Sequence, residues 1–181
     1  MLVKVDFQNA FNTLSRQAIV DAVATQFPSL SRWVTWCYAE ESDLYFGKTR
    51  LGSAAGVQQG DPLGPLLFAA ALQATATELR AGPLDLAFFF LDDGVLAGDV
   101  AAVGAALGVL QARAAAIGLH LNLSKCEAVS TGASQETLSN HLPHDLLFAA
   151  DGSSRVLQHF ELLGAPVGDT AFVAAHTEAK V

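Results

Sequence analysis

The sequence predicts an α+β domain in which helices pack on one face of an antiparallel sheet. The chain has 181 residues, which suits one domain of ordinary size, and 51% of them are hydrophobic, enough for a sizeable core. The patterned segments follow one another as strand, helix, hairpin, helix, strand–turn–strand, helix and strand. No uninterrupted apolar run approaches the ~20 residues that a membrane-spanning helix needs.

Start and stop signals define the elements of the first third of the chain. An apolar run at residues 2–7 predicts a buried strand, and a serine can cap a helix over about 15–27. A second helix is expected at about 30–39. Residues 43–57 predict a hairpin that turns at a Gly-Lys pair. The second helix carries three aromatic side chains that we expect to pack in the core or against a helix rather than to stack on bases: Trp33, Trp36 and Tyr38.

The middle of the chain predicts a helix followed by a strand pair. Residues 58–64 form a loop rich in glycine and proline, and a proline directly after it suits the first turn of a helix over 65–80. Residues 85–91 and 94–98 are expected to be strands joined by the turn Asp-Asp-Gly at 92–94. The Asp-Asp pair would then project from a rigid hairpin.

The last part of the chain is less regular. Apolar positions spaced by three and four over about 99–117 predict a helix, which Gly118 would end. We expect residues 119–130 to be extended and 131–155 to be a poorly patterned polar segment. Residues 156–168 predict a final extended pair.

The net charge and the number of cysteines argue against several classes of protein. The net charge is -8 with ten Lys and Arg residues, the wrong sign for a self-sufficient nucleic-acid binder. Two cysteines, Cys37 and Cys126, make neither a disulfide framework nor a zinc set. The first residues do not resemble a signal peptide. We therefore expect an intracellular protein, nuclear or cytoplasmic and not secreted, without a membrane partner.

Two carboxylate clusters carry most of the functional information. Asp6 ends the apolar run LVKV, and the pair Asp92-Asp93 lies in FFFLDDGVL. Carboxylates held by separate strands are what two Mg²⁺ ions need for phosphoryl transfer. Taken alone, the pair is better explained by a common Asp-Gly hairpin turn, but the two interpretations do not exclude each other.

Between the clusters lies the most specific stretch of the chain, Gln58-Gln59-Gly60-Asp61-Pro62-Leu63-Gly64-Pro65. Two glycines and two prolines within six residues impose a defined loop before a helix. One interpretation is a helix-entry loop in which Asp61 serves as the cap. The other is a backbone that approaches a ligand closely at its glycines.

These segments, taken in order, resemble the palm of a reverse transcriptase, most of all those of non-LTR retrotransposons and group II introns. KVDFQNAFN, QQGDPLGPLLF and FLDDG resemble the first three catalytic motifs, and GLHLNLSKCE and FELLG resemble the fourth and fifth. The resemblance implies a ferredoxin-like polymerase palm over residues 1–168 and a C-terminal tail at 169–181. It also implies an RNA-directed DNA polymerase that extends a DNA primer on an RNA template with deoxynucleoside triphosphates.

The resemblance assigns metal and nucleotide roles by position. Asp6, Asp92 and Asp93 would hold two Mg²⁺ ions, which Mn²⁺ can replace, with the Phe7 carbonyl as a further oxygen ligand. Phe11 would be the steric gate that rejects a ribose 2′-hydroxyl.

Further residues would contact the substrates. Gln59 and Gly60 would lie against the incoming nucleotide and the template, and Leu163-Gly164 would hold the primer end. Lys125 would either donate a proton to the leaving pyrophosphate or be a solvated lysine at a strand end.

Departures from the family pattern leave two alternatives. Phe90 stands where tyrosine is usual, and the fingers and thumb are missing from the sequence, which implies a truncated palm whose partners are those segments of a parent polyprotein. One alternative is an inactive palm remnant of a retroelement. The other is an RNA-dependent RNA polymerase, against which Phe11 and Leu91 argue.

Overall fold

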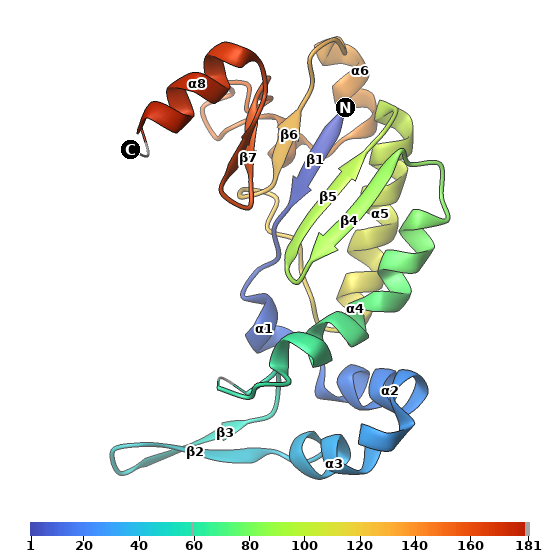
Figure 1. The fold of residues 1–181 in the computed structure, drawn as a ribbon, viewed down its shortest axis with the longest axis vertical. Coiled ribbons are helices and arrows are strands. Elements are labelled where there is room, and N and C mark those ends of the chain that lie inside the picture. The colour runs from blue at the N-terminus through green and yellow to red at the C-terminus, as the bar shows by residue number, and fades with distance from the viewer. Residues whose placement is uncertain (59, 180–181) are drawn as a thin grey trace.

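A computed structural model describes residues 1–58 and 60–179 of the chain. Its centre is a four-stranded antiparallel sheet with the order β4-β5-β1-β6, so the predicted α+β fold class is confirmed (Figure 1). The four strands are β1 (Leu2–Val5), β4 (Leu86–Phe90), β5 (Asp93–Ala97) and β6 (Glu127–Val129).

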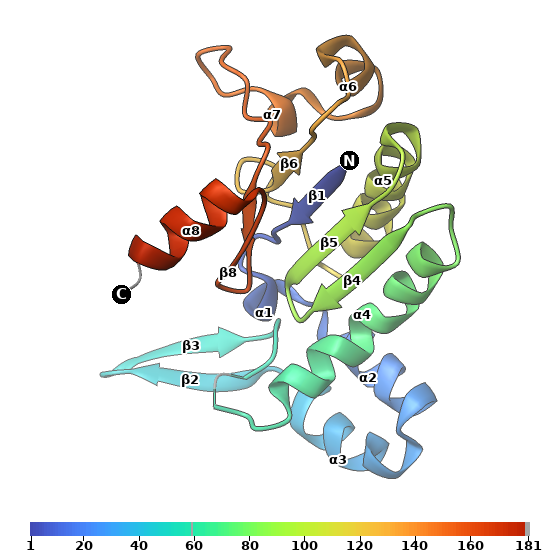
Figure 2. The ribbon, with the colours of Figure 1, turned by 45° about the horizontal axis from the view of Figure 1, so that its top comes forward.

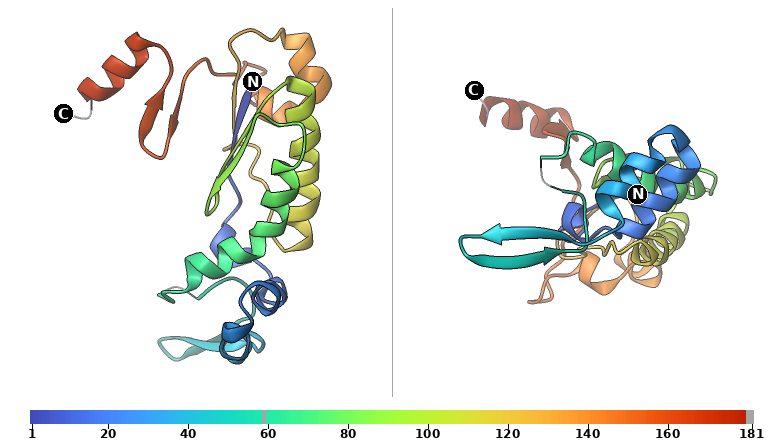
Figure 3. Two further views of the ribbon diagram at one scale, coloured as in Figure 1. Left: turned by 45° about the vertical axis from the view of Figure 1, so that its right-hand side comes forward. Right: turned by 90° about the horizontal axis from the view of Figure 1, so that it is seen from below.

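Two long helices cover one face of this sheet and leave the other face open. They are α4 (Gly64–Arg80) and α5 (Val100–Ala116), and Figure 3 shows both on the same side of the strands. Each buries an apolar stripe against the strands, since Leu67 and Phe68 in α4 and Leu107 in α5 are at most 1% exposed. None of the helices in the described part of the chain is long and apolar enough to cross a bilayer.

Alternation along β1 decides which face each of its side chains occupies. Val3 and Val5 are fully buried and point to the helices, whereas Lys4 points to the open face and forms an ion pair of 3.7 Å with Glu127 of β6. Residue 6 continues the alternation of Lys4. Asp6, the first predicted metal ligand, therefore lies on the open face of the sheet.

The segment after β1 forms a group of elements beyond the end of the sheet. It comprises α1 (Ala10–Thr13), α2 (Arg16–Gln26), α3 (Pro28–Tyr38), β2 (Ser42–Phe46) and β3 (Thr49–Ser53). Ser15 caps α2 as expected, because its hydroxyl accepts the Ala18 N–H at 3.3 Å. The β2–β3 hairpin confirms the predicted hairpin and projects away from the other elements (Figure 2).

The expected packing of the three aromatic side chains is confirmed for Tyr38 and wrong for Trp36. Tyr38 is fully buried, but Trp36 is 81% exposed and Trp33 is 43% exposed. Helix α3 is held by the face that carries Val34 and Tyr38, four residues apart. Trp36 lies between these positions in the sequence and faces away.

The C-terminal third contains more helix than the sequence predicted. The segment 131–155 holds two short helices, α6 (Gln135–His141) and α7 (His144–Leu147), and the expected tail contains α8 (Thr170–Ala179). Strands β7 (Phe160–Leu162) and β8 (Ala165–Val167) form the predicted last hairpin. This hairpin and α8 stand on the side of the sheet opposite α4 and α5 (Figure 3).

The segment 119–130 is not continuously extended as expected. Only β6 is a strand; Leu121 forms an isolated bridge, and the chain between them turns, with the Asn122 carbonyl accepting the N–H groups of Lys125 and Cys126.

The turn between β4 and β5 lies one residue earlier than predicted. Phe90 pairs with Asp93, so the two turn residues are Leu91 and Asp92, and Leu91 has a left-handed φ of 57°. Asp93 and Gly94 belong to β5. The reason is packing: an added Cβ on Gly94 would lie 2.6 Å from the Phe89 ring, so this glycine is needed inside the sheet.

Replacing Gly94 with alanine is expected to lower the free energy of unfolding by about 1–3 kcal/mol, because the new methyl group overpacks the contact between Phe89 and Val5. Gly108→Ala is the matched control. Gly108 lies in α5 with no atom within 4 Å of an added Cβ, so alanine there should stabilise the helix by about 0.5–1 kcal/mol. Urea unfolding of both variants measures the difference, and changes of the same sign would contradict the predicted packing.

Candidate active site

Asp6 lies where β1 leaves the sheet, next to the β4–β5 turn. Val5 pairs with Gly94 and the two strands are antiparallel, so the residue after Val5 and the residue before Gly94, Asp6 and Asp93, lie side by side on the open face. One carboxylate oxygen of Asp6, Oδ1, is buried and has no hydrogen-bond partner among the described residues. A buried, unpaired carboxylate oxygen is costly unless a cation or a proton satisfies it.

Charged neighbours converge on Asp6. Burial raises the pKa of the Asp6 carboxyl, and the negative charges of Asp92 and Asp93 raise it further, while Lys125 and Lys4 oppose the shift. The fold thus brings the three predicted metal ligands and Lys125 into one electrostatic environment, although Lys125 is 119 positions from Asp6 in the chain.

The backbone around Asp6 pairs with the segment that resembles the fourth motif. Phe7 forms an isolated bridge with Leu121, and the Gln8 N–H donates to the His120 carbonyl at 2.8 Å. Phe7 itself is 5% exposed and belongs to the core. These contacts hold the first and fourth motif segments together at the end of the sheet.

Phe11 connects the first motif segment to the second. Its ring stacks on Phe68 of α4 with centroids 4.6 Å apart, and its carbonyl accepts the Val57 N–H at 2.8 Å. The Gly56 N–H donates to the Leu14 carbonyl at 2.7 Å, and an added Cβ on Gly56 would lie 2.5 Å from the Phe11 carbonyl oxygen. The loop before α4 therefore lies directly against α1.

Asp61 organises the loop between residues 58 and 64. Its carboxylate accepts the Tyr38 hydroxyl at 2.5 Å and the Leu63 N–H at 2.8 Å, and the Tyr38 oxygen also accepts the Gln58 N–H at 3.2 Å. Asp61 therefore orders the loop at the entry to α4, but the expectation that it caps the helix is wrong, because Leu63 occupies the N-cap position and no side chain among the described residues caps α4. Gly60 is exposed with a left-handed φ of 88° and open space around it, whereas Gln59 lies outside the described residues.

Replacing Tyr38 with phenylalanine is expected to cost about 1–2 kcal/mol of stability near neutral pH, because Asp61 and the Gln58 N–H each lose a partner. Burial and the bond to Asp61 raise the pKa of Tyr38 from 10.0 to about 12. The contribution of the hydroxyl is therefore complete below pH 10 and is lost as the pH rises through 12.

The two proteins should accordingly converge in stability above pH 10. Tyr45→Phe is the control, since Tyr45 is 70% exposed on the β2–β3 hairpin. Denaturant unfolding between pH 7 and 12 makes the comparison. A constant gap between wild type and Tyr38→Phe across this range would rule out the raised pKa.

Arg16 is a structural residue that the sequence did not reveal. Its side chain is 6% exposed and donates to the carbonyls of Gly56 at 3.3 Å and Glu40 at 3.2 Å, and to both the carbonyl and the hydroxyl of Ser53. Its guanidinium also lies 5.6 Å from the centre of the Tyr38 ring. No local pattern predicts an arginine that ties α2 to three distant segments.

The predicted primer contact lies in the β7–β8 turn. Leu163 and Gly164 both have left-handed φ angles, 48° and 85°, which suits a two-residue hairpin turn. Leu163 is 55% exposed, and the hairpin stands on the open-face side of the sheet.

The donor set at the end of β1 suits hard divalent cations. Among the described residues, no group of three or more His, Cys, Asp and Glu side chains that could hold a metal ion is found. Three mutually repelling carboxylates are expected to separate without a counter-charge. The buried, unpaired Oδ1 of Asp6 and a supply of carboxylate oxygens from two strands nevertheless fit Mg²⁺ or Mn²⁺.

One protein-family model covers most of the chain. The family model of the reverse transcriptases, RNA-dependent DNA polymerases, matches residues 1–167. No curated protein matches the chain. The match takes in the β1 end, the loop before α4, the β4–β5 turn and the turn before β6. The chain therefore belongs to the reverse transcriptase family.

Proposed function

We propose that this RNA-directed DNA polymerase domain uses Asp6, Asp92 and Asp93 to hold two Mg²⁺ ions, with the Phe7 carbonyl as a further ligand. The buried, unpaired Oδ1 of Asp6 beside two further carboxylates carries this proposal. When bound, such ions activate the primer 3′-hydroxyl and neutralise the charge of the leaving pyrophosphate.

The remaining site residues are proposed to position the substrates. Phe11 excludes a ribose 2′-hydroxyl, a role supported by the stacking of its ring on Phe68, which holds the ring in one place. Lys125 donates a proton to the pyrophosphate, supported by its electrostatic contact with Asp6. Gln59 and Gly60 contact the nucleotide and template.

We further propose that residues 1–168 form the palm, that residues 169–181 lie outside it, and that the enzyme is of the non-LTR retrotransposon or group II intron type. Leu163 and Gly164 would hold the primer end. With only ten Lys and Arg residues and a net charge of -8, the chain offers few phosphate contacts. Fingers and thumb segments of a parent polyprotein would supply the rest.

Primer extension on a poly-rA template with an oligo-dT primer tests the metal site. The wild type with Mg²⁺ or Mn²⁺ should extend the primer, and Asp92→Ala should lose the activity. Asp21→Ala is the matched control, because Asp21 lies exposed on α2 and its carboxylate accepts a hydrogen bond from the neighbouring Gln17 side chain. Ribonucleotides should be incorporated by Phe11→Val but not by the wild type.

Failure of a folded wild-type chain to extend any primer would leave the palm assignment in place and would mean that the chain alone is an incomplete or decayed polymerase. It would favour the inactive palm remnant. Extension that survives in Asp92→Ala would exclude Asp92 from the metal site.

A further inference from the structure

Both backbone groups of Asp6 are held by one turn. The Asn122 N–H donates to the Asp6 carbonyl at 2.9 Å, and the Asp6 N–H donates to the Cys126 Sγ at 3.4 Å. Cys126 is fully buried, so this contact is shielded from solvent. The turn at residues 122–126 therefore determines where the Asp6 backbone lies at the end of β1.

The same turn carries Lys125. The ammonium group of Lys125 is the strongest charged influence on the Asp6 carboxyl and lowers its pKa against the effect of burial. One short segment thus sets the position of a proposed metal ligand and of the proposed proton donor.

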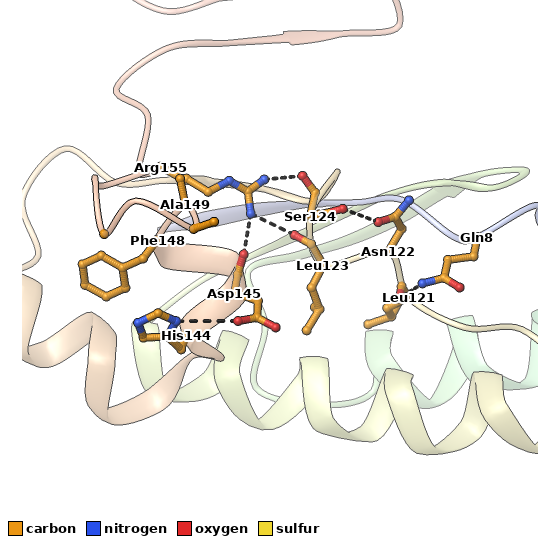
Figure 4. Close-up of a pocket in the computed structure, with 12 residues that line it drawn as sticks. Gln8, Leu121, Asn122, Leu123, Ser124, His144, Asp145, Phe148, Ala149 and Arg155 are labelled. Carbon is orange, nitrogen blue, oxygen red and sulfur yellow. Dashed lines mark hydrogen bonds and ion pairs between the residues drawn. The ribbon is translucent and has the colours of Figure 1, made fainter.

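Arg155, which lies outside this turn in the sequence, binds the main-chain carbonyls of the turn. Its guanidinium donates to the carbonyls of Leu123 at 3.1 Å, Ser124 at 2.5 Å and Cys126 at 3.1 Å, and also to the carbonyl of Asp145 in α7. Figure 4 shows the side chain reaching across to the turn and to Asp145, beside a pocket of about 730 Å³.

The acceptors explain why an arginine is required. All four are main-chain carbonyl oxygens, and two different guanidinium nitrogens each serve two of them. The planar guanidinium group has five N–H donors and can donate to all four carbonyls at once. A lysine offers one nitrogen and a more strongly hydrated charge. Arg155 is itself anchored, since its own N–H donates to the Leu147 carbonyl at 2.8 Å.

We propose that Arg155 is a positioning residue for polymerisation, which fixes the turn 122–126 and through it the Asp6 carboxylate and the Lys125 ammonium. This inference rests on the proposed function, because it assigns Arg155 to the same metal site. The guanidinium of Arg155 contacts main-chain carbonyls, so it acts through the backbone of the turn. Groups that orient metal ligands in this way contribute substantially to metal affinity.

Arg155→Lys tests the proposal in the full chain, with Arg113→Lys as the matched control. Arg113 makes an exposed two-point ion pair with Glu78 between α5 and α4, away from the site. Mn²⁺ titration followed by electron paramagnetic resonance should show affinity weakened by about 10- to 100-fold in Arg155→Lys and unchanged in Arg113→Lys. Unchanged Mn²⁺ affinity in a folded Arg155→Lys protein would overturn the proposal.

Amide hydrogen exchange gives a second readout that needs no metal. The N–H groups of Asp6 and Asn122 should exchange faster in Arg155→Lys, while those of the α4–α5 face should not. If the wild type binds no Mn²⁺, or if its Mn²⁺ binding persists in Asp6→Asn, the proposed metal site is wrong. The exchange rate of the Asp6 N–H would then decide by itself whether Arg155 positions Asp6.

A further variant covers the case in which Arg155→Lys does not fold. Cys126→Ala removes the Sγ acceptor of the Asp6 N–H and leaves the guanidinium contacts in place. It should also weaken Mn²⁺ binding and speed exchange of the Asp6 N–H. Wild-type values for both would show that the turn does not position Asp6.

Discussion

Replacing Asp6 with asparagine is expected to abolish primer extension and, at the same time, to stabilise the metal-free protein. Bound metal ions stabilise the transition state by several kcal/mol, and each step of about 1.4 kcal/mol changes the rate tenfold. Loss of the metal ligand should therefore lower the activity by about three orders of magnitude. The stability change has the opposite sign because the charged Asp6 is disfavoured in the fold by burial and by Asp92 and Asp93.

Thermal unfolding without divalent ions measures the second effect. Removing the negative charge should stabilise the metal-free fold by about 0.5–1 kcal/mol. Asp21→Asn is the control: its carboxylate is exposed on α2, so neither activity nor stability should change appreciably. A destabilised Asp6→Asn protein would show that the carboxylate has a structural partner in the metal-free state.

Added Mg²⁺ should reverse the order of the melting temperatures. A cation that binds only the folded state stabilises it by RT ln(1 + L/Kd), where L is the free cation concentration, so the gain is larger for the protein that binds the ion more tightly. The wild type should therefore gain more from Mg²⁺ than Asp6→Asn does. An equal gain in both proteins would place the bound ion elsewhere.

Replacing Arg16 with leucine is expected to lower the free energy of unfolding by about 3 kcal/mol or more. The guanidinium is buried and joins α2 to the Glu40, Ser53 and Gly56 segments, so its loss removes this donor from one buried and two partly buried carbonyls. Bonds from a charged donor are each worth about 1.5–3 kcal/mol, and buried carbonyls are costly to leave unpaired.

Arg50→Leu supplies the comparison for Arg16. Arg50 makes an exposed ion pair with Asp43 at 2.7 Å across the β2–β3 hairpin, which should be worth about 1 kcal/mol or less. Urea unfolding of the two variants and the wild type gives both values. Equal losses would contradict the role of Arg16 as the link between the hairpin and α2.

The Arg16 substitution should also affect the loop that borders the candidate active site. Because Arg16 binds the Gly56 carbonyl and Gly56 lies against the Phe11 backbone, the loop before α4 should loosen. Faster amide exchange at Val57, whose N–H donates to Phe11, would report this loosening.

The sequence by itself determined the elements and the chemistry at the end of the sheet. Alternation in LVKV set which side chains of β1 meet the helices, so the open-face position of Asp6 follows from residues 2–6 alone. Serine capping, the Gly/Pro loop and helical spacing predicted α2, α4 and α5 within a residue or two. These features depend on neighbours within a few positions.

Only the tertiary structure decided how distant residues combine. The β4–β5 turn moved to Leu91-Asp92 because Gly94 must pack against Phe89, and Trp36 is exposed because α3 is held by its other side. Arg16 and Arg155 bind main-chain carbonyls of residues far away in the sequence. Every residue has such a carbonyl, so the pattern of side chains cannot predict these contacts. Local periodicity predicts elements, whereas such long-range hydrogen bonds exist only once the chain has folded.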